Sequence, residues 1–90
     1  MNSYKILSDY IFHAMKNAEI VRLDDGTYAG RIPQCQGVVA FGKSPEACKN
    51  KLQTALEGWI LLGLKSGHSL PVIRGINLNQ EPYYEHELGL

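Results

Sequence analysis

The sequence lacks an excess of charge of either sign, because nine lysine and arginine residues balance nine aspartate and glutamate residues among 90. Direct binding to nucleic acid needs a clustered basic surface, so this balance argues against it. The sequence also has no apolar run of about 18 residues or more, and no basic start followed by an apolar stretch, so we expect no membrane span and no secretion signal. A chain this short supports one hydrophobic core. We therefore predict one small cytoplasmic domain over residues 1–78.

Cysteine is scarce. Cys35 and Cys48 are the only two, and they match neither a metal-ligand spacing nor a Cys-x-x-Cys redox motif. Reduced cysteines of cytosolic proteins behave as small apolar groups. The glycines are dispersed and form no phosphate-binding or dinucleotide motif. We expect no disulfide, no metal and no cofactor.

Two segments have the spacing of helices. Apolar residues recur every three or four positions over residues 3–17, which predicts an amphipathic helix. A longer helix begins after Ser44, a capping residue, with Pro45 at its first position. Gly67 ends it, because glycine accepts the left-handed conformation common after a helix.

Strands are predicted between and after these helices, at residues 19–23, 27–32, 38–41 and 72–78. The first three form an antiparallel meander, the long helix packs on the sheet, and the fourth is an edge strand parallel to the first. The fold class is therefore α+β in the order α-β-β-β-α-β, followed by a loose tail over residues 79–90. The residues assigned to turns and caps are Asp25, Gly26, Pro33, Gly37, Ser44, Pro45 and Gly67.

The candidates for catalysis are weak. Asp24 and Asp25 are adjacent, whereas two-metal chemistry needs three or four acids that converge from different elements. Turn chemistry explains both residues, and a small metal-dependent hydrolase that uses them with a histidine is the alternative. Nothing local activates Cys35 as a nucleophile. We expect the histidines to face solvent: His13, His68 and His86.

The end of the long helix is apolar on every side. A sheet of this size covers one face of a helix, so the remaining face meets the first helix, another copy of the chain or a different protein. Unpaired groups on the edge strands, expected to be the third and fourth, offer a second route for a partner. The predicted partner or oligomer interface consists of Trp59, Ile60, Leu61, Leu62 and Leu64.

A series of short motifs follows through residues 19–73. They are Asp25-Gly26-x-Tyr28, Ile32-Pro33, Gly37-Val38, Gly42, Ser44-Pro45-Glu46-Ala47, Ala55-Leu56-x-x-Trp59 and Gly67-x-x-Leu70-Pro71. In this order and spacing they resemble the HicB-like antitoxin family. The resemblance is closest to a short bacterial subgroup with an added N-terminal helix, which residues 3–17 supply.

This resemblance implies a partial ribonuclease-H-like fold without the acids of the nuclease. It also implies a non-enzymatic role as the antitoxin of a type II toxin–antitoxin system. The partner is then a HicA-type toxin, a small mRNA-cleaving protein with a double-stranded-RNA-binding-like fold, whose catalytic surface the antitoxin covers. Members of the family form dimers or tetramers.

Two departures from the family pattern bear on this interpretation. Few residues follow Leu78, so we expect neither a helix-turn-helix nor a ribbon-helix-helix domain that binds the operator. Gln34-Cys35-Gln36 stands where the family has Asp-Leu-Pro, which removes a proline and a charge. The alternative is an orphan oligomeric module that binds another protein or a small ligand.

Overall fold

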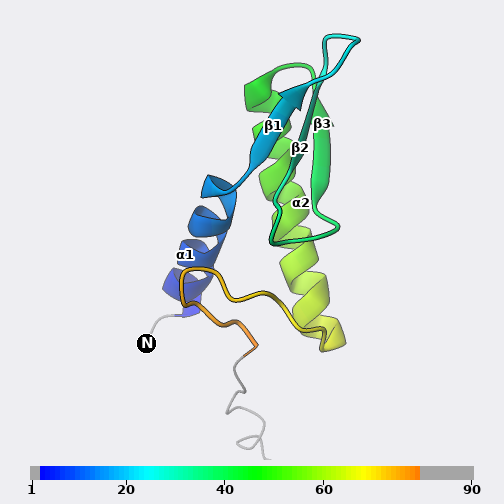
Figure 1. The fold of residues 1–90 in the computed structure, drawn as a ribbon. Helices are drawn as coiled ribbons and strands as arrows, with labels where there is room; N and C mark the ends of the chain where they lie inside the picture. Colours follow the sequence, from blue (N-terminus) through cyan, green and yellow to red (C-terminus); the bar gives the residue numbers. More distant parts are fainter. Residues whose placement is uncertain (1–2, 80–90) are drawn as a thin grey trace, which may run out of the picture.

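The structure, a computed structural model, describes residues 3–79 and contains two helices and one sheet (Figure 1). The sheet order is β1-β2-β3, and both strand pairs are antiparallel. The predicted α+β class, the three-stranded meander and the two helices are confirmed. The elements are α1 (Ser3–Lys16), β1 (Glu19–Arg22), β2 (Tyr28–Arg31), β3 (Val39–Gly42) and α2 (Pro45–Ser66).

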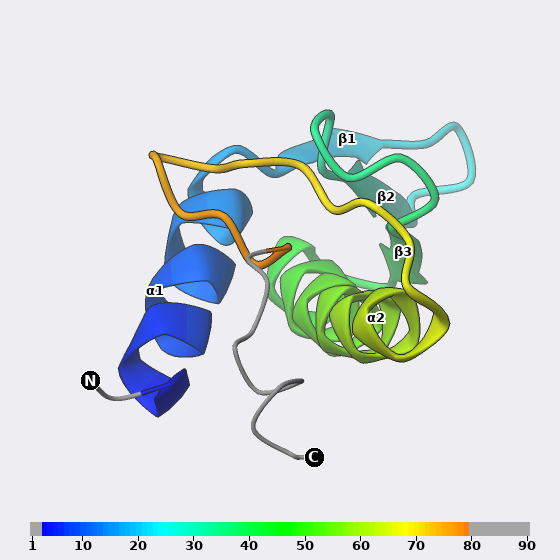
Figure 2. The ribbon, with the colours of Figure 1, turned by 90° about the horizontal axis from the view of Figure 1, so that it is seen from below.

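The N-terminal half of α2 packs closely against one face of the sheet (Figure 2). Two glycines permit the close approach. A Cβ added at Gly30 in β2 would lie 3.1 Å from Cys48 Sγ, and one added at Gly42 in β3 would lie 2.5 Å from the Cys48 backbone nitrogen. Because a glycine has no Cβ, the sheet and the helix backbone come together where any other residue would hold them apart.

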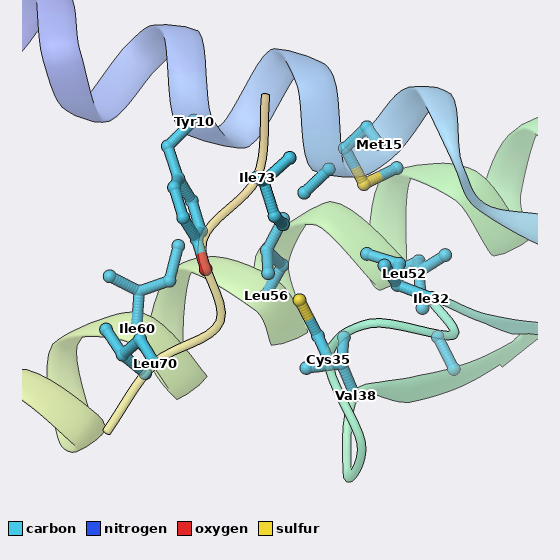
Figure 3. Packing of buried hydrophobic residues seen from close by; sticks show 12 residues of the cluster. Tyr10, Met15, Ile32, Cys35, Val38, Leu52, Leu56, Ile60, Leu70 and Ile73 are labelled. Carbon is cyan, nitrogen blue, oxygen red and sulfur yellow. The ribbon is translucent and has the colours of Figure 1, made fainter. Parts of the chain in front are cut away.

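The core continues beyond the sheet along the C-terminal half of α2 (Figure 3). There α1 and the loop between β2 and β3 contribute the side chains that meet the helix. Tyr10 from α1 and Cys35 from that loop are both completely buried. The buried cluster comprises Tyr10, Ala14, Met15, Ile32, Cys35, Val38, Ala40, Leu52, Leu56, Ile60, Leu70 and Ile73.

The fourth strand predicted over residues 72–78 is wrong. The described sheet has three strands, and residues 67–79 form a strap that returns from the end of α2 to α1 (Figures 1 and 2). The chain reverses immediately after Ile73, with positive φ at Arg74 and Gly75, so no extended run is long enough to pair with β1. Ile73 is instead buried in the core, which the sheet alone is too small to cover.

Hydrogen bonds hold the strap in place. The Tyr10 hydroxyl donates to the Pro71 carbonyl oxygen at 2.7 Å. The Asn79 side chain accepts from the Leu70 backbone nitrogen and donates to the Leu70 carbonyl oxygen, each at 2.7 Å. Asn79, predicted to begin a loose tail, is instead the last residue of the strap and is held to Leu70. Residues 80–90 of the predicted tail lie outside the described residues.

The loss of the fourth strand changes the sheet edges. β1 and β3 are the two edge strands of the described sheet, rather than the third and a fourth. None of the described helices is both long and apolar enough to cross a membrane.

Candidate interaction surfaces

The structure divides the five residues of the predicted interface between the core and the surface. Ile60 is 1% exposed and belongs to the core, where it also lines the floor of a hollow between α1 and α2. Trp59 is half-buried, packs against the core, and places its indole beside Gly37. Leu61, Leu62 and Leu64 are exposed to solvent, at 61%, 62% and 45%. We call these three leucines the α2-end patch.

Helical geometry explains this division. The buried residues of α2 recur every three or four positions and form one stripe that faces the sheet, the loop and the strap. Ile60 lies in that stripe, whereas the neighbouring leucines point away from it. The stripe comprises Cys48, Leu52, Leu56, Ile60 and Gly63.

A groove between α1 and α2 adjoins the α2-end patch at Leu61. Its first part is a hollow of about 320 Å³ that Leu7 and Ile11 line from α1. Its second part, of about 410 Å³, shares Ser8, Ile11 and Glu57 with the first and extends along α1 to Lys16. Its lining is mixed: Ser8, Ile11, Phe12, Met15, Lys16, Lys49, Gln53 and Glu57.

The face of the sheet opposite α2 is a third surface, which we call the outer sheet face. Val21, Val39 and Phe41 project from it and are between 55% and 59% exposed. An antiparallel sheet covered on one side ordinarily carries polar residues on the other. The signal that could have revealed this face is the run 38–41, because all four of its residues are apolar and successive residues of a strand point to opposite faces.

The outer sheet face is also hollowed. Small Ala29 lies between Val21 and Phe41 on neighbouring strands, and the hollow above it has a volume of about 200 Å³. Beside it, the Arg31 guanidinium donates to a carboxylate oxygen of Glu19 at 3.0 Å, across the β1–β2 pair. Both charged side chains are more than half exposed.

Asp25 holds the turn between β1 and β2. Its carboxylate accepts from the Thr27 hydroxyl at 2.6 Å and from the Thr27 backbone nitrogen at 2.9 Å. These bonds, the hydroxyl first, lower the pKa of Asp25. Gly26 follows with φ of 87°, a left-handed conformation that glycine adopts without strain. The Asp25 carboxylate therefore stabilises the turn through its hydrogen bonds with Thr27.

The other predicted turn and cap residues lie at element boundaries. Pro33 follows Ile32, whose carbonyl oxygen accepts from the Cys35 backbone nitrogen at 2.9 Å, and Gly37 lies in the next turn with φ of 102°. Ser44 accepts from the Ala47 backbone nitrogen at 3.0 Å and caps α2 immediately before Pro45. Gly67, with φ of 73°, ends the helix.

Cys35 and the histidines are the remaining candidates for nucleophilic and metal chemistry. Burial raises the pKa of the Cys35 thiol to about 11, so the thiolate needed for attack is disfavoured. His68 is exposed to solvent, as predicted. His13, also predicted to face solvent, is half-buried, and its Nδ1 atom has no hydrogen-bond partner. His86 lies outside the described residues. Within residues 3–79, no three histidine, cysteine, aspartate or glutamate side chains gather where a metal could bind.

Comparisons with known proteins agree with this fold. A model of the UPF0150-like family matches residues 9–71. The chain belongs to the UPF0150-like family. Its structure is similar to the crystal structure of TTHA0281 from Thermus thermophilus, with a TM-score of 0.79 and 35% sequence identity over 87% of this chain and 96% of that chain. A search of curated proteins finds no significant match. Neither the family description nor the structure's name states an activity.

Proposed function

We propose that this protein is a HicB-like antitoxin of a bacterial type II toxin–antitoxin system. It acts in the cytoplasm without catalysis and neutralises a HicA-type mRNA-cleaving toxin by steric contact. The motif series over residues 19–73 supports this proposal, as does an α+β fold in which a three-stranded antiparallel meander is followed by a long helix. The observation that carries it is the α2-end patch, three leucines displayed together beside an open groove.

The patch has the composition of a protein-binding surface. Burying exposed leucines contributes about 25 cal/mol for each Å² of apolar surface removed from water. Glu57 lines both parts of the neighbouring groove and offers a carboxylate close to Leu61. A protein that cleaves RNA carries basic side chains to hold phosphates, so its catalytic surface is suited to an acid beside an apolar patch. A toxin seated there could no longer receive RNA.

Co-expression tests this function. The chain is tagged and produced with the small reading frame adjacent to its gene, and copurification and rescue of growth are scored together. Leu61→Lys places a charge where the patch meets the groove and should abolish both. Val72→Lys is the matched control, because Val72 is 54% exposed and lies on the strap, outside the patch. Equal rescue by both variants would refute the role of the patch, and the absence of any complex would refute the antitoxin function.

The outer sheet face favours a second candidate, an orphan oligomeric module. Exposed apolar residues on both the sheet and α2 support self-association into a dimer or tetramer, whether or not a toxin exists. This version predicts a stable assembly with no toxic neighbouring gene product, and a further protein or a small ligand as its partner.

A further inference from the structure

We infer that the groove between α1 and α2 is the binding site for an acidic segment of this same chain, residues 80–90, which follow the strap in the sequence. The inference goes beyond the proposed function and does not depend on a toxin. Its consequence is regulatory. Leu61 belongs both to the groove and to the α2-end patch, so the bound segment and a protein seated on the patch would compete for it.

The strap ends where the groove begins. Asn79, its last residue, is bonded to Leu70 at both the backbone nitrogen and the carbonyl oxygen. Leu70 packs against α2, since a Cβ added at Gly63 would lie 2.7 Å from Leu70 Cδ2. Ile60, about one turn before Gly63, lines the first part of the groove. The segment therefore starts beside that part, and Figure 2 shows the last described residues of the strap between the two helices.

The segment is long enough to follow the groove. On one wall, Leu7 and Lys16 are separated by about 14 Å along the axis of α1, at a rise of about 1.5 Å per residue. On the other wall, Leu61 and Lys49 are separated by about 18 Å along α2. An extended chain advances about 3.3 Å per residue, so Glu85 can lie about 20 Å beyond the end of the strap. The acids of the segment can therefore reach the lysines of the groove.

The chemistry of the segment and that of the groove follow the same order. The first part of the groove is mainly apolar, whereas the second part carries the ammonium groups of Lys16 and Lys49. In the segment, two adjacent tyrosines precede Glu85 and Glu87, and residues 80–90 contain no lysine or arginine. Alternate residues of an extended chain face the same side, so both acids can face the two lysines together. This complementarity of charge selects the segment as the occupant.

Acids also line the groove, and the same register accommodates them. Glu57 lies in both parts and accepts from the Gln53 side-chain nitrogen at 3.2 Å. A tyrosine hydroxyl of the segment can donate to the same carboxylate. Glu46 lies in a further hollow of about 490 Å³ past the lysines. Glu81 precedes the tyrosines and stays close to the strap, so it does not pass Glu57.

The covalent connection makes weak contacts sufficient. Exposed ion pairs contribute little individually and are screened by salt. A segment joined to the fold at Asn79 has an effective concentration at the groove in the millimolar range, however, so it binds without the entropy cost of a separate partner. We therefore expect the segment to be bound at low ionic strength and released at high salt.

Paramagnetic broadening of NMR signals tests this binding on the full chain. Gly89→Cys introduces a thiol for a nitroxide label, which attaches there alone because Cys35 and Cys48 are completely buried. Compared with the reduced label, the nitroxide should broaden the amide signals of Met15 and Gln53, which line the groove. The signals of the turn between β1 and β2 should not change.

Charge reversal in the groove identifies the contacts. Lys16→Glu combined with Lys49→Glu should abolish the broadening. The matched control reverses Lys51 and Lys65, exposed lysines of α2 that line none of the three hollows. This control changes the net charge by the same amount and should retain the broadening.

Charge reversal in the segment is the second variant. Glu85→Lys combined with Glu87→Lys should also abolish the broadening, and it alters no residue of the described fold. It therefore serves if the groove variant fails to fold by circular dichroism. Combining the reversed acids with Lys16→Glu and Lys49→Glu should restore the broadening, because opposite charges face each other again.

Other results would overturn the inference. They are a wild type whose groove signals are not broadened, an equal loss in the matched control, and a combined reversal that restores nothing. Broadening that arises when an unlabelled, isotope-enriched chain is mixed with a nitroxide-labelled one would assign the contact to another copy. Because no toxin is present, these results are separate from the copurification that tests the antitoxin function. A bound segment in a chain that captures no toxin would sustain this inference and refute the antitoxin function.

Discussion

Replacing Gly42 by alanine tests the close approach of α2 to the sheet. The added Cβ would lie 2.5 Å from the backbone nitrogen of Cys48, 2.8 Å from its Cα and 3.0 Å from the carbonyl carbon of Ala47. Favourable carbon contacts lie at about 3.5–4.0 Å, so the overlap approaches 1 Å and involves backbone atoms that cannot rotate away. The first turn of α2 must then move off β3. Overpacking of this kind costs about 3 kcal/mol of the free energy of unfolding.

Gly58→Ala is the matched control for that substitution. Gly58 lies within α2, and a Cβ there would meet nothing within 4 Å. The same change of one methyl group should therefore stabilise the protein by about 0.5–1 kcal/mol, because alanine loses less backbone entropy in a helix. For a domain of this size, thermal unfolding should show Tm lowered by about 12–24 °C in Gly42→Ala and raised by about 4 °C in Gly58→Ala. A Gly42→Ala variant within about 1 kcal/mol of the wild type in urea unfolding would refute the reasoning.

Three further predictions concern hydrogen bonds and titration. Tyr10→Phe leaves the Pro71 carbonyl oxygen without its donor and should lower the free energy of unfolding by about 1–2 kcal/mol in urea. Burial raises the pKa of the Cys35 thiol from 9.0 to about 11, so the thiol ionises first in the unfolded chain. Its contribution to the free energy of unfolding should be fully present below pH 9.0 and should be lost as the pH rises to about 11. Urea unfolding at alkaline pH should show this fall, and Cys35→Ala should remove that part of it. The hydrogen bonds from Thr27 lower the pKa of Asp25, so the ionised carboxylate stabilises the folded chain at pH values above the ordinary pKa of aspartate. This contribution is lost as the pH falls through the lowered pKa. Thermal unfolding in acid should show a shallower loss for Asp25→Asn, and a slope identical to the wild type would contradict the role of the turn.

Local chemistry made much of the fold predictable. The predicted helix over residues 3–17 differs by one residue from α1, because its apolar period directly reflects helical geometry. The start of α2 was predictable for a similar reason. The Ser44 cap and Pro45 act on groups within the same turn, so no distant residue decides them.

The strap was not predictable in this way. Residues 72–78 have apolar side chains that suit a strand, but the contacts that place them come from far along the chain. The hydrogen bond between Tyr10 and Pro71 joins residues 61 positions apart. An extended segment of this kind can pair with a sheet edge or fill a gap between helices, and only the available space decides between the two.

The interaction surfaces show the same limit. The sequence identified an apolar excess between Trp59 and Leu64 but not which side chains the core would take. Burial of Ile60 and partial burial of Trp59 depend on where the loop and the strap pack against α2. The outer sheet face was missed because an apolar run in a strand predicts burial on both faces, and only the layer order shows that one face is left open.

The sequence by itself determined the two helices and the three strands of the meander, with their caps and turns, because hydrogen bonds and periodicity within a few residues specify these. The tertiary structure alone decided that β1 is an edge strand, that residues 67–79 complete the core, and that Leu61, Leu62 and Phe41 remain at the surface. These outcomes depend on which apolar surfaces meet. The hydrophobic effect favours the burial of apolar surface but has no directional preference, so the arrangement of the whole chain decides which apolar surfaces are covered.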